Sequence, residues 1–350
     1  MTRTSEYVSP GHPDKVADYI SSYLLDRYMA RDPRVRFALE CQIKDSHVTL
    51  GGEITSTYNM SDDERHKHVR DAICAIGYTP GYAAVWGAEN CIDPDNLDVV
   101  AHIGQQSPDI AQGVDADGWG DQGIFWGMAT GDERTDFMPL DHYLAKKLGK
   151  WLYESALNGT LPIGLDIKTQ ITTMDGRVHN AIVAAPVKTD EDGKTLRKAV
   201  VEWLELNCGA DFALAANRIV VNGTGAYVRH ASAGDCGTTG RKLAVDFYGG
   251  NCFIGGGCPW GKDATKADVT LNVYARRLAI ADKLATGHDT VYCALDCCIG
   301  RRDVKLIYYD GHLNQIGGSI IFDKPSDIVA KVGLDLPVFA SKCRNGLFSA

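Results

Sequence analysis

Residues 255–268 read Gly-Gly-Gly-Cys-Pro-Trp-Gly-Lys-Asp-Ala-Thr-Lys-Ala-Asp, a glycine-rich loop that carries two lysines and ends in a carboxylate. Because glycine lacks a side chain, backbone N–H groups of such a loop can approach phosphate oxygens closely. The amphipathic stretch from residue 267 predicts a helix, and a helix N-terminus favours anions. Lys262 and Lys266 add positive charge, so the loop predicts a binding site for a polyphosphate.

Three interpretations of this loop remain open from its residues alone. Gly256, Gly261 and Lys262 nearly complete a Walker A loop, but Asp263 stands where that motif has a Ser or Thr hydroxyl for Mg²⁺. An aspartate there would repel the β- and γ-phosphates unless a metal lay between them. The loop could therefore be an ordinary P-loop, a glycine turn without function, or a triphosphate-binding loop of a different kind. We favour the last of these.

The composition is that of a globular protein with more than one core. The chain has 350 residues, which exceeds one comfortable hydrophobic core. With 36 Lys and Arg against 45 Asp and Glu, the net charge of -9 argues against nucleic acid as a partner. The opening residues lack the apolar core of a signal peptide, and no apolar stretch is long enough to span a membrane. We expect a cytoplasmic protein without a membrane partner, whose 11 cysteines are reduced and mostly buried.

Hydrophobic periodicity and turn signals predict a cycle of two strands and a helix that occurs three times. Helices are expected at residues 13–30, 61–77, 140–157, within 196–207 and at 267–285, and strands at 37–43, 48–55, 167–174, 178–186, 218–221, 242–248, 291–297 and 304–309. The last cycle is expected to begin with the strands at 218–221 and 242–248. Residues 104–123 are polar and glycine-rich, which is typical of a mobile loop that covers a site.

The segment Ser-Pro-Gly-His-Pro-Asp-Lys at residues 9–15 is a second candidate site. Pro13 begins the helix, which places His12 at its cap and Asp14 in its first turn. Functionally, His12 and Lys15 would meet phosphate while Asp14 holds Mg²⁺, a cation that takes few carboxylates together with substrate oxygens. A helix cap without further function is the alternative.

A third candidate, Gly-Asp-Cys-Gly-Thr-Thr-Gly-Arg-Lys, occupies residues 234–242. Arg241 offers a bidentate fork and Lys242 a point charge, a pair suited to triphosphate, although a surface turn with solvated charges is the alternative. Other single residues could be part of the site, but each also has an explanation without function. Glu40 and Glu53 could be strand residues that face water, Lys168 an exposed lysine, and Asp268 a carboxylate at a helix start.

Taken together, these segments resemble the S-adenosylmethionine synthetase family, also called methionine adenosyltransferases. The motifs that carry the resemblance, in order, are Gly-His-Pro-Asp-Lys (11–15), Gly-Gly-Glu-Ile-Thr (51–55), Gln-Ser-Pro-Asp-Ile (106–110), Gly-Asp-Gln-Gly (120–123), Gly-Asp-Cys-Gly (234–237) and Gly-Lys-Asp (261–263). The resemblance implies an α+β fold of three pseudo-symmetric two-layer α/β-sandwich domains, which we expect at residues 1–111, 112–228 and 229–350. It weakens after about residue 310, where the closing segment resembles a trimmed version of the family's end.

The resemblance also implies the reaction. The methionine sulfur attacks C5′ of ATP, and the released triphosphate is hydrolysed to phosphate and pyrophosphate. A neutral thioether needs no general base, so the barrier lies in the charge that accumulates on the leaving triphosphate. Preorganised cations and alignment of the sulfur with C5′ lower such a barrier.

Roles for individual residues follow from the same resemblance. The catalytic residues would be His12, Lys168, Arg241 and Lys262. The ATP-binding residues would be His12, Asp166, Lys168, Tyr227, Asp235, Arg241, Lys242, Cys258 and Lys262. The methionine-binding residues would be Glu53, Gln106, Asp235, Lys262 and Lys266, with Asp121 as a further active-site carboxylate. Asp14 and Asp268 would bind Mg²⁺, with two ions expected per site, and Glu40 would belong to a K⁺ site. The family implies a homodimer with the active site at its interface, and a dimer of dimers as the next assembly.

The chain departs from the family pattern at several positions. Pro10 replaces an acidic or polar residue, and Ala226 stands where an arginine normally precedes the aromatic Tyr227. Residues 258–260, Cys-Pro-Trp, replace smaller and Phe-Ser residues, Val-Thr replaces Arg-Ser at 269–270, and the loop at 104–121 is shorter. Two rival functions remain: a catalytically silent regulatory subunit, although His12, Lys168 and Lys262 are retained, and a P-loop ATPase.

Overall fold

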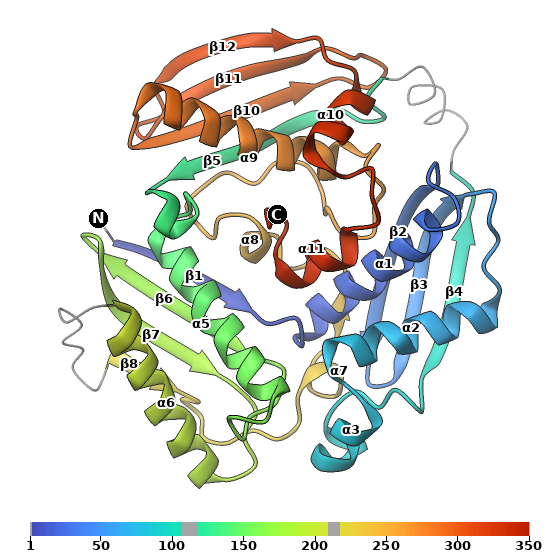
Figure 1. Ribbon diagram of the computed structural model, residues 1–350. Coiled ribbons are helices and arrows are strands. Elements are labelled where there is room, and N and C mark those ends of the chain that lie inside the picture. The colour runs from blue at the N-terminus through green and yellow to red at the C-terminus, as the bar shows by residue number, and fades with distance from the viewer. Residues whose placement is uncertain (1, 107–117, 209–217, 350) are drawn as a thin grey trace.

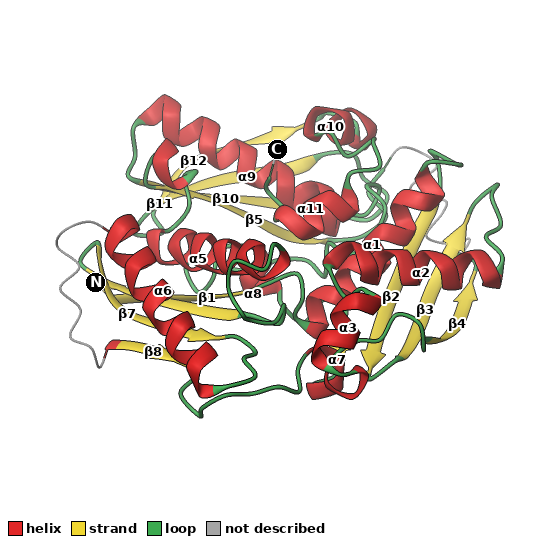
Figure 2. Ribbon diagram, turned by 60° about the horizontal axis from the view of Figure 1, so that its bottom comes forward, coloured by secondary structure: helices red, strands yellow, loops and turns green. Residues whose placement is uncertain are grey.

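The computed structural model describes residues 2–106, 118–208 and 218–349. Within these ranges the chain forms three four-stranded sheets. Figure 1 shows the sheets around a common centre that holds α8 (Leu243–Asp246) and α11 (Phe339–Asn345). In Figure 2 the longer helices lie together on one side of the sheets, so that each sheet and its helices form a two-layer unit.

The first sheet, ordered β4-β3-β2-β9, carries the start of the candidate site. Its strands are β2 (Arg36–Lys44), β3 (His47–Thr55), β4 (Asp98–Gly104) and β9 (Gly237–Thr238), and its helices are α1 (Pro13–Met29) and α2 (Asp62–Ile76). Pro13 opens α1, while Ser61 and Glu64 form a capping box on α2. Helix α2 ends at Gly77, which has a φ of 114° that suits glycine. These caps confirm the helix starts and the stop that the sequence indicates.

The second sheet, ordered β1-β6-β7-β8, joins the N-terminus to the middle of the chain. Its strands are β1 (Thr2–Val8), β6 (Lys168–Met174), β7 (Arg177–Ala184) and β8 (Ile219–Val221), and its helices are α5 (Leu140–Leu157) and α6 (Asp190–Cys208). Asp175 and Gly176, both with positive φ, make the expected hairpin turn between β6 and β7. Strand β1 pairs with β6 from across the chain, with Tyr7 opposite Thr169.

The third sheet, ordered β12-β11-β10-β5, likewise contains a strand from another part of the chain. Its strands are β5 (Gly123–Thr130), β10 (Thr290–Cys297), β11 (Val304–Asp310) and β12 (Gln315–Ile321), and its helices are α9 (Ala267–Thr286) and α10 (Pro325–Val332). Strand β5 pairs with β10, with Ala129 opposite Val291. Of two short helices, α3 (Pro80–Trp86) follows α2 within the first unit, and α7 (Ala231–Gly234) lies between β8 of the second sheet and β9 of the first.

One strand prediction in the last cycle is wrong, and another strand is present but belongs to a different unit than expected. Residues 242–248 form the short helix α8 and a turn, because Asp246 is drawn inward to a buried lysine. The strand at 218–221 exists as β8, but it pairs in parallel with β7 and so belongs to the second sheet. The apolar residues of segment 242–248 indicated a buried segment, but burial alone does not determine whether that segment is a helix or a strand.

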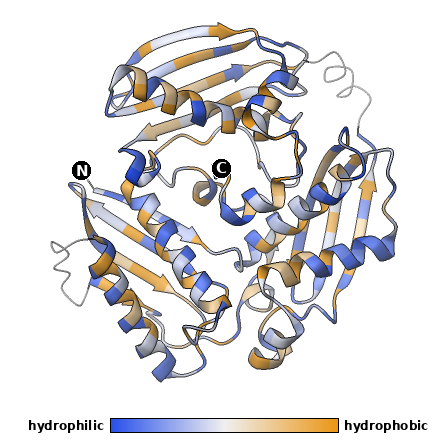
Figure 3. Cartoon of the chain, viewed as in Figure 1, coloured by the Kyte–Doolittle hydropathy of each residue, from blue (hydrophilic) through white to orange (hydrophobic). Residues whose placement is uncertain are grey.

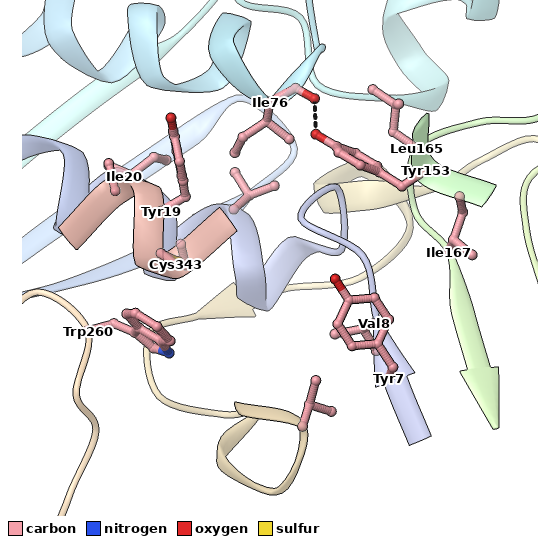
Figure 4. Packing of buried hydrophobic residues seen from close by; sticks show 14 of the residues in the cluster. Tyr7, Val8, Tyr19, Ile20, Ile76, Tyr153, Leu165, Ile167, Trp260 and Cys343 are labelled. Atoms are coloured by element: carbon pink, nitrogen blue, oxygen red, sulfur yellow. Dashed lines mark hydrogen bonds between the residues drawn. The ribbon is translucent and has the colours of Figure 1, made fainter. Parts of the chain in front are cut away.

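Buried side chains from all three units meet in one core. In Figure 4, Tyr153 of α5 donates its hydroxyl hydrogen to the carbonyl oxygen of Ile76, which ties α5 to the end of α2. Trp260 of the glycine loop and Cys343 of α11 lie in the same core. In Figure 3, α2 is largely hydrophilic along its outer side, as expected for a surface helix. Among the described residues, no helix is long and apolar enough to cross a membrane.

Candidate active site

The glycine loop extends the first sheet along the edge of β2. The backbone N–H of Leu39 donates to the oxygen of Gly261 at 2.8 Å, and Lys262 makes an antiparallel bridge with Ala38. Gly261 has a φ of 66°, and a Cβ atom built on it would lie 2.2 Å from the carbonyl oxygen of Leu39. Only glycine therefore fits where the loop meets the strand.

Asp263, the residue that does not suit a Walker A loop, holds this loop in place. Its buried carboxylate accepts hydrogen bonds from the backbone N–H of Phe37 at 2.7 Å and of Thr265 at 2.9 Å. The ammonium of Lys266 lies 2.9 Å from the same carboxylate. The carboxylate is thus fully engaged in closing the loop against β2 and does not face a phosphate.

Beside the loop, a cavity of about 200 Å³ brings together six of the predicted site residues. These residues are Glu53, Gln106, Asp121, Lys262, Lys266 and Asp268. Inside it, Lys262 Nζ lies 2.5 Å from Asp268 Oδ2, and Asp268 Oδ1 accepts from the backbone N–H of Gly257 at 2.6 Å. The cavity therefore presents cations and carboxylates within a small volume, a set of groups that suits a zwitterion. Most of the predicted mobile loop, residues 107–117, lies outside the described residues.

A second group of charges surrounds the start of α1. His12 is buried and its Nδ1 accepts from the backbone N–H of Asp14 at 3.1 Å. Asp14 in turn accepts from Lys242 Nζ at 2.5 Å and from the backbone N–H of Thr238 at 2.9 Å. Burial, together with the charges of Lys168 and other nearby cations, lowers the pKa of His12 to about 2. His12 is therefore neutral at physiological pH, and because Nδ1 is an acceptor, its proton is on Nε2.

The other predicted cations lie around this helix start. Arg241 Nε is 3.8 Å from Asp14 Oδ1, and more than half of its side chain is exposed. Lys168, the first residue of β6, is exposed, and its charge acts on His12. Asp235 is also exposed, and its carboxylate caps the backbone N–H of Cys236 at 2.8 Å. Asp235 does not line the cavity beside Lys262.

The buried carboxylate of Asp166 has a hydrogen-bond partner within the protein on only one of its two oxygens. Its Oδ2 accepts from the backbone N–H of Ala231 at 2.9 Å, whereas its Oδ1 is buried without a hydrogen-bond partner. Burial raises the pKa of this carboxyl to about 6. Tyr227 donates its hydroxyl hydrogen to the backbone oxygen of Asp166 at 2.7 Å, which fixes the segment. This oxygen can therefore accept a hydrogen bond from a donor such as a hydroxyl group.

Strand β2 relates the two groups in space. Thr238, next to the Asp14 group, pairs with Gln42, and Lys262 pairs with Ala38 on the same edge of β2. Four strand residues correspond to about 13 Å. Between them, a Cβ atom on Gly240 would lie 2.9 Å from Cβ of Cys258, so the two loops touch. Cys258 is half-buried there, and its sulfur accepts from the backbone N–H of Trp260 at 3.2 Å.

The candidate metal ligands fit cations that are completed by a substrate. Among the described residues, no three Asp, Glu, His or Cys side chains gather into a site for a metal ion. Asp14 and Asp268 each offer one carboxylate beside a lysine, and Mg²⁺ is commonly bound by one or two carboxylates plus phosphate oxygens and water. Glu40 is exposed on β2, opposite Gly51.

The structure contains a buried ion cluster that the sequence does not predict, and the expectation that Lys15 contacts phosphate is wrong. Lys15 does not face the position expected for phosphate, because its ammonium is buried 3.0 Å from Asp18 and 2.6 Å from Asp246. The spacing of Lys15 and Asp18 on one helix face was a signal for the first pair. Asp246 gave no such signal, since it comes from a distant segment.

A neutral histidine at a helix cap, flanking cations and a separate cavity lined by charges of both signs are the features expected of a group-transfer enzyme that acts on a polyphosphate. The comparisons with known proteins agree with this class. Three descriptions match the chain: S-adenosylmethionine synthetase, N-terminal domain (residues 1–108), central domain (116–227) and C-terminal domain (229–349). The chain belongs to the S-adenosylmethionine synthetase family, and its expected activity as a methionine adenosyltransferase is confirmed.

Individual relatives cover nearly the whole chain. It is 38% identical over 315 residues to S-adenosylmethionine synthase 1 of Rhodopseudomonas palustris, a match that covers 87% of this chain and 79% of that one. It is 33% identical to S-adenosylmethionine synthase of Zymomonas mobilis, covering 99% and 92%. Among solved structures, an unusual S-adenosylmethionine synthetase from Campylobacter jejuni aligns with a TM-score of 0.85 at 31% identity, covering 99% of this chain and 94% of that one. The predicted three-unit α+β fold is therefore confirmed.

Proposed function

We propose that the two groups of residues divide the substrates of the methionine adenosyltransferase reaction between them. The methionine sulfur attacks C5′ of ATP, the C5′–O bond breaks, and its electron pair leaves with the triphosphate. Water then hydrolyses the triphosphate to phosphate and pyrophosphate. The observation that carries the proposal is the cavity that gathers Glu53, Gln106, Lys262 and Lys266, because its charges match both ends of an amino acid.

In this proposal, methionine occupies the cavity beside the glycine loop. Glu53 binds its ammonium group, Gln106 and Lys266 bind its carboxylate, and Asp121 closes the cavity as a further carboxylate. Its volume of about 200 Å³ is below the range of about 300–1,000 Å³ for pockets that hold drug-sized ligands, which favours a small substrate. Asp235, also predicted to bind both substrates, lies outside this cavity and stays a prediction.

ATP binds along the start of α1. The Nε2–H of neutral His12 donates to the leaving oxygen, and Arg241, Lys242 and Lys168 neutralise the phosphates, as does Lys262 from the glycine loop. The unpaired Oδ1 of Asp166 accepts from a ribose hydroxyl, which supports its predicted role. Tyr227 and Cys258 shape the walls of the nucleotide site. Fixed donors of this kind stabilise charge that develops in the transition state.

Mg²⁺ and K⁺ are the proposed cofactors. Asp14 and Asp268 would hold two Mg²⁺ ions against the phosphates, and the ions would neutralise charge that develops on the leaving group. Asp14 is paired with Lys242 and Asp268 with Lys262, so each of the two carboxylates is held in place by a neighbouring lysine. Glu40 would act indirectly, through a K⁺ ion that orders the site.

We further propose a homodimer in which each site combines residues from two chains. The open face of the first sheet exposes Glu40 and Glu53, and Val100 of β4, which is 43% exposed, lies on the same face opposite Thr49. Ion-binding residues on a sheet face fit a surface completed by a second copy. Mixing inactive H12A and K262A homodimers tests this. If each site combines His12 of one chain with Lys262 of the other, one of the two sites in a mixed dimer is intact. Because about half of the dimers are mixed after subunit exchange, about a quarter of the wild-type activity should return. No recovery despite exchange would place each site within one chain.

A product assay tests the activity itself. ATP, methionine, Mg²⁺ and K⁺ should yield S-adenosylmethionine with equal molar phosphate and pyrophosphate, separated by chromatography. A P-loop ATPase would form ADP without methionine, and a silent regulatory subunit would form no product. Either result would refute the proposed reaction.

A further inference from the structure

A buried ion cluster lies directly behind the phosphate-binding end of α1. The side chains of Lys15, Asp18 and Asp246 are at most 5% exposed. One ammonium faces two carboxylates, with Nζ of Lys15 3.0 Å from Asp18 and 2.6 Å from Asp246. Burying charges is costly unless their hydrogen-bonding groups are also satisfied. The cluster therefore requires further partners to hold a fixed geometry.

Trp260 supplies such a partner from the glycine loop. Its indole Nε1–H donates to Oδ2 of Asp246 at 2.7 Å, so both oxygens of that carboxylate are engaged. The same indole lies over Lys15, whose Nζ is 4.4 Å from the ring centroid. Trp260 itself is 2% exposed. One side chain thus contacts the cation and one of the anions of the cluster, a role that a phenyl ring cannot fill completely.

The cluster holds both ends of the segment that carries the phosphate cations. At one end the backbone N–H of Gly240 donates to Oδ1 of Asp18 at 2.8 Å. At the other end Asp246 closes helix α8, which begins directly after Lys242. Arg241 and Lys242 lie between these two anchors. Any shift of Asp246 relative to Asp18 therefore moves the two cations relative to His12.

We propose that Trp260 is a positioning residue: by fixing the Lys15–Asp18–Asp246 cluster, it sets where Arg241 and Lys242 meet the triphosphate. The inference rests on the proposed function of those two cations. Trp260 lies in the Cys-Pro-Trp segment of the glycine loop, directly before Gly261 and Lys262.

The substitution Trp260→Phe tests the proposal, since it keeps a ring over Lys15 but removes the indole N–H. The loss of a hydrogen bond to a charged group predicts a kcat about tenfold lower and a similar weakening of inorganic tripolyphosphate binding with Mg²⁺, measured by calorimetry. The KM for methionine should change by less than about twofold, because the cavity at Lys262 is not involved. Trp203→Phe in α6 is the matched control and should behave as the wild type.

A double-mutant cycle separates positioning from a general loss of structure. Asp246→Ala removes both the acceptor of the indole N–H and the charge that faces Lys15. If Trp260 acts through Asp246, adding W260F to D246A should lower kcat by less than about twofold more, because the indole no longer has its acceptor. Additive losses would overturn the proposal. It would also fail if tripolyphosphate affinity and kcat were unchanged in W260F, or if kcat fell only in proportion to the folded fraction measured by circular dichroism. Wild-type protein that makes no sulfonium product would instead refute the proposed function, while tripolyphosphate binding would still test the positioning role.

Discussion

The substitution His12→Asn separates the structural role of this histidine from its proposed catalytic one. In the wild type, Nδ1 of His12 caps α1 by accepting the backbone N–H of Asp14, and Nε2 carries the proton. The side-chain oxygen of asparagine caps helices as well as any residue does. Asparagine has no donor that reaches the position of Nε2, so the variant loses only the contact to the leaving oxygen.

The expected effect on catalysis follows from the neutral state of His12. Because its pKa is lowered to about 2, the residue contributes a dipolar N–H donor and not a full positive charge. Removing one preorganised donor of this type costs about 10²–10³-fold in kcat. Loss of folding stability at pH 7.5 should stay below about 1 kcal/mol, since the cap is retained.

The same pKa predicts an effect on acid stability. The imidazole titrates at 6.5 when unfolded but near 2 when folded, so the unfolded state binds more protons between these values. Its contribution is therefore fully present above pH 6.5 and is lost progressively as the pH falls. At pH 5 protonation of His12 in the unfolded chain costs the wild type about 2 kcal/mol, which the variant does not lose.

Two measurements test this reasoning. Formation of S-adenosylmethionine at pH 8 gives kcat, and urea unfolding at pH 7.5 and pH 5 gives the free energy of unfolding. His312→Asn, at an exposed histidine, is the control for both. The reasoning is refuted if H12N keeps kcat within about fivefold of the wild type. It also fails if the variant and the wild type lose equal stability between the two pH values.

Three further substitutions test other parts of the site. Lys262→Ala should lower kcat about a hundredfold because the lysine acts on developing charge, and near-normal turnover would remove it from the phosphate site. Asp166→Asn should raise the KM for ATP and also raise Tm at pH 8. Burial raises the pKa of the carboxyl to about 6, so the folded protein loses stability as the pH rises from 3.8 through 6 and the carboxyl ionises, a loss that asparagine avoids. An unchanged KM with a lower Tm would contradict this. Gly261→Ala should cost more than about 2 kcal/mol through the contact with Leu39, whereas Gly287→Ala, with positive φ in open space, should cost about 1 kcal/mol. Equal losses of denaturant stability would show that the contact is relieved.

The sequence predicted the local elements better than their partners. Caps such as Ser61 with Glu64 and the turn at Asp175 are determined by neighbouring residues, and both were found. Residues 242–248 were assigned to a strand because their helix depends on the ion pair of Asp246 with Lys15, more than 200 residues away. Contacts of that kind leave no local pattern.

The same limit applies to the candidate site. The motifs identified the residues that line the cavity at Lys262, because each motif has a recognisable composition. The role of Asp263 was not visible, since it depends on how the loop aligns with β2. Likewise, the glycine loop indicated phosphate chemistry, but its residues do not reveal that Trp260 turns inward to the ion cluster.

The exchange of strands between distant segments has a consequence for how the chain reaches its folded state. Strand β1 can pair only after β6 has been synthesised, and β5 only after β10. Ala129 therefore pairs with Val291 only after more than 160 further residues have been synthesised. Such long loops raise the contact order and slow folding, and the unpaired edges left in the meantime invite aggregation. We therefore expect the nascent chain to rely on late, concerted closure of its three sheets, and fragments cut between them to remain unfolded.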